Sequence, residues 1–193
     1  MYKRQSGTAL GSHTPVHPND HVNRSQSTND VFPAAIHVAA AKHLKDGLLP
    51  ALDALVRALD AKAQAWMPIV KIGRTHLQDA VPLRLGDEVG AWRDQLKQAQ
   101  AWLEDCLVSL GDLPLGGTAV GTGLNTPPGF RHAVAEELSR VAGVKVRPAD
   151  NLFAVMAGHD ALVQAMGQLR LLAVALLRIA NDCLLYTSDA ADD

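Results

Sequence analysis

A short polar segment at residues 73–80 combines side chains that could move a proton and hold an anion. Arg74, Thr75, His76 and Gln78 place a guanidinium, a hydroxyl, an imidazole and an amide within five positions. Histidine is the side chain that ordinarily titrates nearest neutrality, which suits it to transfer protons at working pH. We therefore take His76 as the candidate catalytic group and Thr75 as a candidate ligand to substrate.

A second polar cluster directly precedes an apolar helical stretch. Ser27, Thr28 and Asn29 stand in a run of six polar residues, 25–30. Ser, Thr and Asn are preferred helix caps, so a well-capped helix is one interpretation. Helix amino termini also attract anions through free N–H groups, so these side chains are also candidates to bind a carboxylate.

A similar turn lies just upstream. His17, Pro18, Asn19 and Asp20 are again polar groups around a proline suited to a first helical position. The glycine-rich segment 115–126 lacks the Lys-Ser or Lys-Thr of a phosphate loop and the third glycine of a dinucleotide turn. Its glycines are expected to permit unusual backbone conformations and close approach.

The elements that position these clusters are predicted to be long helices. Residues 89, 92, 96, 99, 103, 106 and 110 are apolar at alternating steps of three and four, which is typical of helices packed nearly parallel. No sustained period-two alternation indicates a sheet. Helices are predicted at 30–66, 84–112, 129–142 and 151–182. Loops or short turns are predicted at 11–26, 67–83 and 113–128. The predicted fold class is all-α, a long-helix bundle.

Three details of the helices carry further expectations. Pro50, which follows Gly47, should kink or divide the first helix. His159 falls on the predicted apolar stripe of the last helix and is interpreted as a structural imidazole. Apolar residues off the main stripes, such as Val163 and Val174, suggest that the helices need further neighbours, and therefore self-association.

The bulk properties restrict the function classes. The chain has 193 residues, a formal net charge of -2 and 48% hydrophobic residues. No basic run supports binding to nucleic acid or to a membrane surface, and no apolar run predicts a segment that spans a bilayer. The two cysteines, Cys106 and Cys183, have no metal-ligand spacing, which is typical of a reduced, cytoplasmic protein.

Taken together, the motifs resemble the class II fumarase branch of the fumarase/aspartase superfamily. The resemblance covers residues 11–182, and its motifs follow in the order of that family. They are Val16 to Asn23, Ser25 to Pro33, Gly73 to Ala80, Leu115 to Thr126, His159 to Val163 and Ile179 to Asp182.

The resemblance implies reversible hydration of fumarate to L-malate, with no metal or organic cofactor. It implies that Ser27, Thr28, Asn29 and Thr75 bind the dicarboxylate and that His76 handles the proton of the water or hydroxyl. It also implies that the motif from His17 to Asp20 (His17, Pro18, Asn19 and Asp20) forms a second dicarboxylate site. Family active sites are built from three subunits of a homotetramer.

The chain also departs from the family pattern. An amino-terminal domain would precede Leu10, and a mobile signature loop with a carbon-proton base would follow Asp182. We therefore expect residues 11–182 to be part of a central helical lyase domain. Residues 1–10 are expected to be a non-native or linker segment and residues 183–193 a non-native tail, and the chain is expected to be inactive alone.

Two alternatives stay open. Aspartate ammonia-lyase typically has Gln where His76 stands and Asn-Pro-Asn-Asn at residues 17–20, whereas Thr28 and residues 81–82 are aspartase-like. The other alternative is a non-catalytic helical assembly protein of the same superfamily, in which the polar turns only cap helices.

Overall fold

The computed structural model describes residues 7–9 and 11–185. The chain forms two compact units. One contains the described residues up to Ala39 together with Gly111–His159, and the other contains Ala40–Leu110 and the described residues from Asp160 onward. The prediction that residues 1–10 and 183–193 are non-native falls largely outside the described part.

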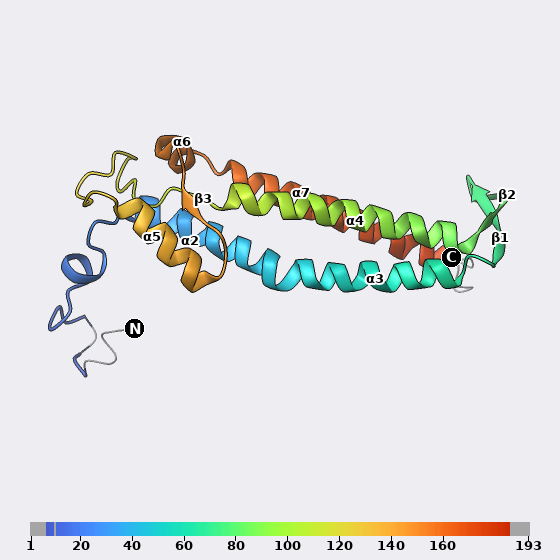
Figure 1. The fold of residues 1–193 in the computed structure, drawn as a ribbon, viewed down its shortest axis with the longest axis horizontal. Coiled ribbons are helices and arrows are strands. Elements are labelled where there is room, and N and C mark those ends of the chain that lie inside the picture. Colours follow the sequence, from blue (N-terminus) through green and yellow to red (C-terminus); the bar gives the residue numbers. More distant parts are fainter. Residues whose placement is uncertain (1–6, 10, 186–193) are drawn as a thin grey trace. The chain divides into compact units, whose positions relative to one another are not determined.

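The second unit is built on three long helices, α3 (Leu49–Ala65), α4 (Leu85–Leu110) and α7 (Asp160–Leu185), which run side by side (Figure 1). The predicted stripe on α4 is confirmed, because all seven of its residues are buried. Side-chain hydrogen bonds also join α4 to α7. Trp92 Nε1 donates to Asp182 Oδ2 at 3.2 Å, and Ser109 Oγ donates to Gln164 Oε1 at 2.7 Å. The all-α, long-helix prediction is confirmed.

The first predicted helix is divided where proline led us to expect it. Helix α2 (Thr28–His43) passes through a π-helical turn, η2 (Leu44–Leu48), into α3, and Pro50 lies in the first turn of α3. Proline has no N–H to donate to the turn before it, and here the wider η2 turn directly precedes it, so the chain continues as helix beyond Pro50.

The prediction of a loop at 67–83 is wrong. Strands β1 (Val70–Thr75) and β2 (Gln78–Arg84) form an antiparallel hairpin. The register slips between Ile72 and Arg74, so Gly73 lies in a bulge. Most residues of both strands are exposed, and β2 contains Pro82. A strand without a buried face has no period-two pattern to detect, which explains the missed hairpin.

The predicted helix 151–182 is interrupted. Helix α6 (Leu152–Ala157) ends at Gly158, whose backbone is extended, and α7 begins at Asp160. His159 lies exposed in the break, so the prediction that it occupies a core stripe is wrong. From His159 the predicted stripe continues at steps of three and four through Met166 to Ala173, whereas the buried residues of α7 are Ala165 and Leu172, so the predicted stripe is offset by one residue.

By length and composition only, helix α7 is long and apolar enough to cross a membrane. This differs from the sequence prediction that no apolar run could span a bilayer. Large apolar side chains remain exposed on it, including Val163, Met166, Val174 and Leu177. Core helices of soluble proteins can have the same composition, so a single helix of this kind is weak evidence for membrane insertion. Unless a partner surface covers this apolar face, these side chains stay exposed to water.

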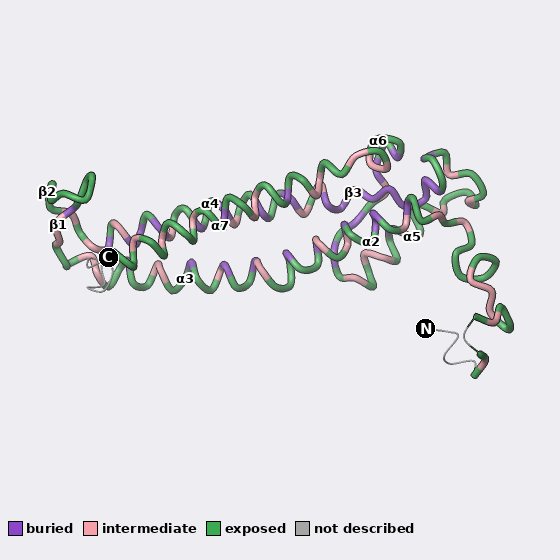
Figure 2. Tube along the Cα trace, turned by 180° about the vertical axis from the view of Figure 1, so that it is seen from behind, coloured by how far each residue is buried: buried purple, intermediate pink, exposed green. Residues whose placement is uncertain are grey.

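The first unit carries a core of its own. Helix α5 (Phe130–Ala142), predicted at 129–142, is confirmed. The short strands β3 (Asp112–Leu113) and β4 (Arg147–Pro148) pair in parallel. Figure 2 shows the buried stretch beside β3, and residues 113–118 are all buried. The turn η1 (Pro18–Val22) belongs to the same unit.

Candidate functional site

The amino terminus of α2 is a reciprocally capped helix start. Ser27 Oγ accepts from the backbone N–H of Asn29 at 3.2 Å, and Asp30 Oδ1 accepts from the backbone N–H of Ser27 at 2.9 Å. This is the capping-box arrangement, with Asp in place of the usual Glu or Gln. The capping interpretation of Ser27 is therefore correct, while the side chains of Thr28 and Asn29 are exposed and take no part in the cap.

The glycine-rich segment packs against this helix start. Asn29 Nδ2 donates to the carbonyl oxygen of Ala119 at 2.8 Å, and Ser25 Oγ donates to the carbonyl oxygen of Asn125 at 2.9 Å. A Cβ on Gly117 would lie 2.5 Å from the sulfur of Met156. The expectation that glycines permit close approach is thus met where α6 packs on the segment.

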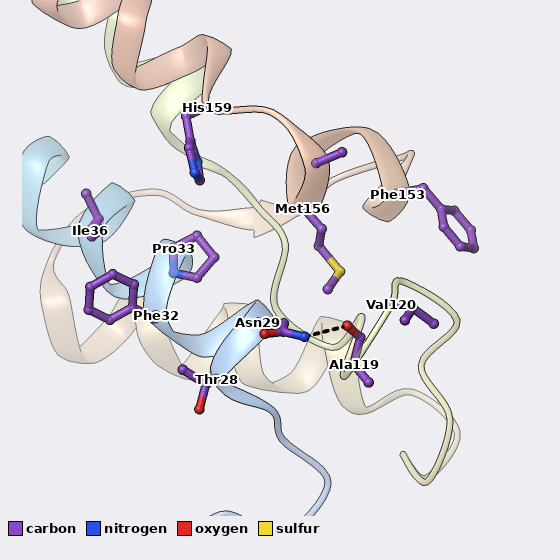
Figure 3. Close-up of a pocket in the computed structure, with 11 residues that line it drawn as sticks. Thr28, Asn29, Phe32, Pro33, Ile36, Ala119, Val120, Phe153, Met156 and His159 are labelled. Atoms are coloured by element: carbon purple, nitrogen blue, oxygen red, sulfur yellow. Dashed lines mark hydrogen bonds between the residues drawn. The ribbon is translucent and has the colours of Figure 1, made fainter.

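A pocket of about 700 Å³ opens between α2, the glycine-rich segment and α6 (Figure 3). Its polar lining comes from Thr28, Asn29 and His159. Its other lining residues are Phe32, Pro33, Ile36, Ala119, Val120, Phe153, Met156 and Ala157. Figure 3 shows the Asn29 side chain bonded to Ala119 at one side of the pocket and the His159 ring on another. An imidazole that lines the same pocket as two predicted anion ligands is a feature that sequence reasoning missed.

The predicted second site lies close by in the same unit. A pocket of about 450 Å³ is lined by Asn19 together with Ser27 and Thr28, so the two polar turns share a surface. His17 caps η1: its Nδ1 accepts from the backbone N–H groups of Asn19 at 3.3 Å and Asp20 at 3.1 Å. An acceptor Nδ1 requires the ring proton to sit on Nε2, so this nitrogen is the one that can donate to a ligand.

Part of this second turn is therefore structural. The His21 ring also accepts from the backbone N–H of His17 at 2.8 Å. Pro18 occupies the first turn of η1, as its sequence position suggested. Asn19 and Asp20 are exposed, and only Asn19 reaches the pocket shared with Ser27 and Thr28.

Thr75 and His76 lie in the other unit, at the tip of the hairpin. His76 and Leu77 form a two-residue turn with φ of 52° and 62°. Positive φ at both central residues is the requirement of a type I′ hairpin turn, normally met by Asn-Gly. The tip exposes Thr75, His76 and Leu77 to solvent, with Leu77 75% exposed.

The base of the hairpin is held to α4. Lys71 Nζ lies 2.7 Å from Glu88 Oε2, and both side chains are largely buried. Near the tip, Arg74 Nε lies 3.1 Å from Asp79 Oδ1. The structure thus gathers Ser27, Thr28, Asn29 and Asn19 in one unit, and presents Thr75 and His76 on a braced hairpin in the other.

Among the described residues, no group of three or more His, Cys, Asp or Glu side chains is arranged to hold a metal ion. The polar groups on these surfaces are hydroxyls, amides, imidazoles and a helix start. Such groups can bind carboxylates and exchange protons.

Comparison with known proteins assigns the chain to a class. It belongs to the family described as Lyase, which matches residues 2–192. More particularly, it is 68% identical over 93% of its length to a class II fumarate hydratase of Parasynechococcus marenigrum, and 53% identical over 92% of its length to one of Neisseria meningitidis. The resemblance to class II fumarases is confirmed.

Solved structures agree. The chain matches the recombinant class II fumarase of Schistosoma mansoni with a TM-score of 0.88 at 40% identity, over 91% of this chain and 40% of that one. It matches a cobalt-bound fumarate lyase:delta crystallin protein of Brucella melitensis with a TM-score of 0.86 at 38% identity, over 96% of this chain and 40% of that one. The chain spans 38% of the length of each of the two curated relatives named above.

Proposed function

We propose that this chain is part of a class II fumarate hydratase, which catalyses the reversible hydration of fumarate to L-malate. The observation that carries the proposal is the 68% identity to a fumarate hydratase over nearly the whole chain. The helix start at Thr28 and Asn29 supports it, because neutral donors at a helix amino terminus suit a small dicarboxylate. We propose that this reaction is a step of the tricarboxylic acid cycle and that it takes place in the cytoplasm.

The proposed roles follow from the chemistry of the reaction. Removal of the carbon proton from malate sends negative charge into the neighbouring carboxylate, and preorganised donors must stabilise that charge. Thr28 and Asn29 would supply such donors, joined by Ser27, whose oxygen already serves the cap, and by Thr75. His76 would deliver a proton to the departing hydroxyl, and in the reverse direction would take one from water. The residues 17–20 would form an accessory dicarboxylate site.

We propose that these groups meet through assembly of several copies into a homotetramer. Thr75 and His76 are displayed at an exposed tip, as they would be if they completed a site on another copy. The uncovered apolar residues of α7 support association through that helix. The same apolar helix could instead cross a membrane, but α7 carries Asp182, whose carboxylate accepts from Trp92 of α4, and a carboxylate would be costly there. A chain with 38% of a relative's length is therefore proposed to be inactive alone.

A chimera tests the function. Residues 11–182 replace the matching segment of the P. marenigrum relative, and hydration is followed by the ultraviolet absorbance of fumarate. His76→Gln should lower kcat by about 10²- to 10⁴-fold, the usual contribution of a general acid–base group. His43→Gln, at an exposed histidine of α2, is the matched control and should retain activity.

The alternatives give different results in the same chimera. Deamination of aspartate without hydration would favour an aspartate ammonia-lyase, and an assembled tetramer without either activity would favour a structural protein. Equal activity of His76→Gln and His43→Gln would contradict the proposed role of His76. Clear turnover by the isolated chain would contradict the proposed inactivity.

A further inference from the structure

Asp30 is a fully buried carboxylate beside the proposed substrate-binding residues. Its exposed fraction is 0%, and burying a charged group is costly unless hydrogen bonds replace its water. Oδ1 accepts from the backbone N–H of Ser27 at 2.9 Å, and Oδ2 accepts from those of Gly116 and Thr118, each at 3.0 Å. Hydrogen bonds to an ionised acceptor are roughly twice as strong as neutral ones.

These bonds serve two segments far apart in the sequence. A capping box requires one acceptor for the amide of Ser27, and Oδ1 alone satisfies it. Oδ2 binds only the glycine-rich segment. There Gly116 has φ of 92° and Thr118 has φ of 58°, a left-handed conformation that a threonine rarely adopts. Strain of this kind persists where the surrounding structure enforces it.

The segment held by Asp30 in turn holds Asn29. Ala119 directly follows Thr118, and its carbonyl oxygen accepts from Asn29 Nδ2 at 2.8 Å. This bond fixes one amide hydrogen and so orients the second hydrogen and the amide oxygen. Asn29 lines the pocket of Figure 3, so the chain of contacts runs from Asp30 through the segment to a pocket side chain.

We infer that Asp30 is a positioning residue, which anchors the glycine-rich segment so that the Asn29 amide is preset for a substrate carboxylate. The inference rests on the proposed function. A negative charge next to an anion site opposes binding, so electrostatics alone predicts that removing the charge strengthens binding. Positioning predicts the reverse, and the two effects therefore have opposite signs.

The first test uses the 193-residue chain. Asp30→Asn keeps the shape of the side chain, but an amide has a single, uncharged oxygen. It therefore cannot accept from Ser27 with one oxygen and from the glycine-rich segment with another, as the carboxylate does. In two-dimensional NMR the amide protons of Gly116 and Thr118 should move upfield. The control is Ser25→Ala, which removes a different bond between the same segments and should leave those two signals in place. Unmoved signals in Asp30→Asn would overturn the inference.

The second test measures coupling in the active chimera. Asp30→Asn should raise the KM for malate about tenfold with little change in kcat, the pattern expected when ground-state binding is lost. In an Asn29→Ala background, Asp30→Asn should add little, because a residue that acts through another gives non-additive effects. Additive effects, or a lower KM, would overturn the role of Asp30.

A variant that fails to assemble does not end the test. Gly116→Ala keeps the carboxylate but displaces its partner, because the added Cβ would lie 2.6 Å from the Cβ of Arg131 at a positive φ. It should give the same KM increase and the same lack of additivity with Asn29→Ala. An unmodified chimera without turnover would overturn the proposed function, whereas turnover with additive effects would overturn only the role of Asp30.

Discussion

Two glycines one helical turn apart on α4 should respond in opposite ways to the same substitution. Gly86 lies at the base of the hairpin that carries His76, where its N–H donates to the carbonyl oxygen of Trp66 at 3.2 Å. A Cβ on Gly86 would lie 2.4 Å from the carbonyl oxygen of Ala63 and 2.5 Å from the sulfur of Met67. A Cβ on Gly90 would meet no heavy atom closer than 3.8 Å.

The expected magnitudes follow from two opposing effects. Alanine is favoured over glycine inside a helix by about 1 kcal/mol. Overpacking costs about 1–3 kcal/mol, and the upper part of that range applies to Gly86→Ala because a backbone oxygen cannot rotate away. Gly86→Ala should therefore lower the unfolding free energy by about 1–2 kcal/mol, while Gly90→Ala should raise it by about 0.5–1 kcal/mol.

Urea unfolding followed by far-ultraviolet circular dichroism measures both variants against the parent chain. The difference between the two variants, about 1.5–3 kcal/mol, is larger than the usual error of the linear extrapolation. In the chimera, Gly86→Ala should also lower hydration activity by disturbing the hairpin base. A Gly86→Ala chain as stable as Gly90→Ala would refute the close packing of α3 against α4 at this point.

Two further outcomes follow from local geometry. Leu77→Gly should stabilise the hairpin by about 1 kcal/mol, because a left-handed conformation costs a non-glycine residue about that much. The protection of the β1 amides against hydrogen exchange should therefore rise. Unchanged protection would contradict the positive φ of 62° at Leu77. Burial raises the pKa of the Cys106 thiol, with Asp105 adding to the effect, so the folded state holds this proton more tightly than the unfolded state. The stability contribution is therefore complete below the ordinary thiol pKa and is lost as pH rises above it, and alkylation should modify exposed Cys183 long before buried Cys106.

The helices could be predicted because their burial is one-sided. Along α4, seven apolar residues at steps of three and four meet α3 and α7, and each is buried. The same pattern of apolar residues predicted the wrong face of the last helix. Residues 162, 166 and 169 and residues 161, 165, 169 and 172 are all apolar at steps of three or four, so both stripes fit the pattern on a helix that is apolar on most faces. Only packing decides between two such stripes, and it selected the one that contains Ala165 and Leu172.

The hairpin and the break at Gly158 were beyond sequence patterns for a different reason. Strands β1 and β2 bury little, and their turn uses His76 and Leu77 where a pattern would seek Asn-Gly. The break before α7 moves His159 from a predicted core position to a pocket wall. Residue types at the candidate site were predictable, whereas partners such as Ala119 are distant in sequence and become neighbours only through the fold.

The capping and binding interpretations of residues 27–30 are compatible, because the cap uses Ser27 Oγ only as an acceptor and does not involve the side chains of Thr28 and Asn29. The cap consumes the acceptor capacity of Ser27 and one oxygen of Asp30. It leaves the hydroxyl of Thr28, one amide hydrogen of Asn29 and the partial positive charge of the helix start directed outward. A weakly capped helix start would fray and scatter these donors, so secure capping is a condition for binding a dicarboxylate at this position. We propose that the run of six polar residues is longer than a cap needs because it would serve both purposes.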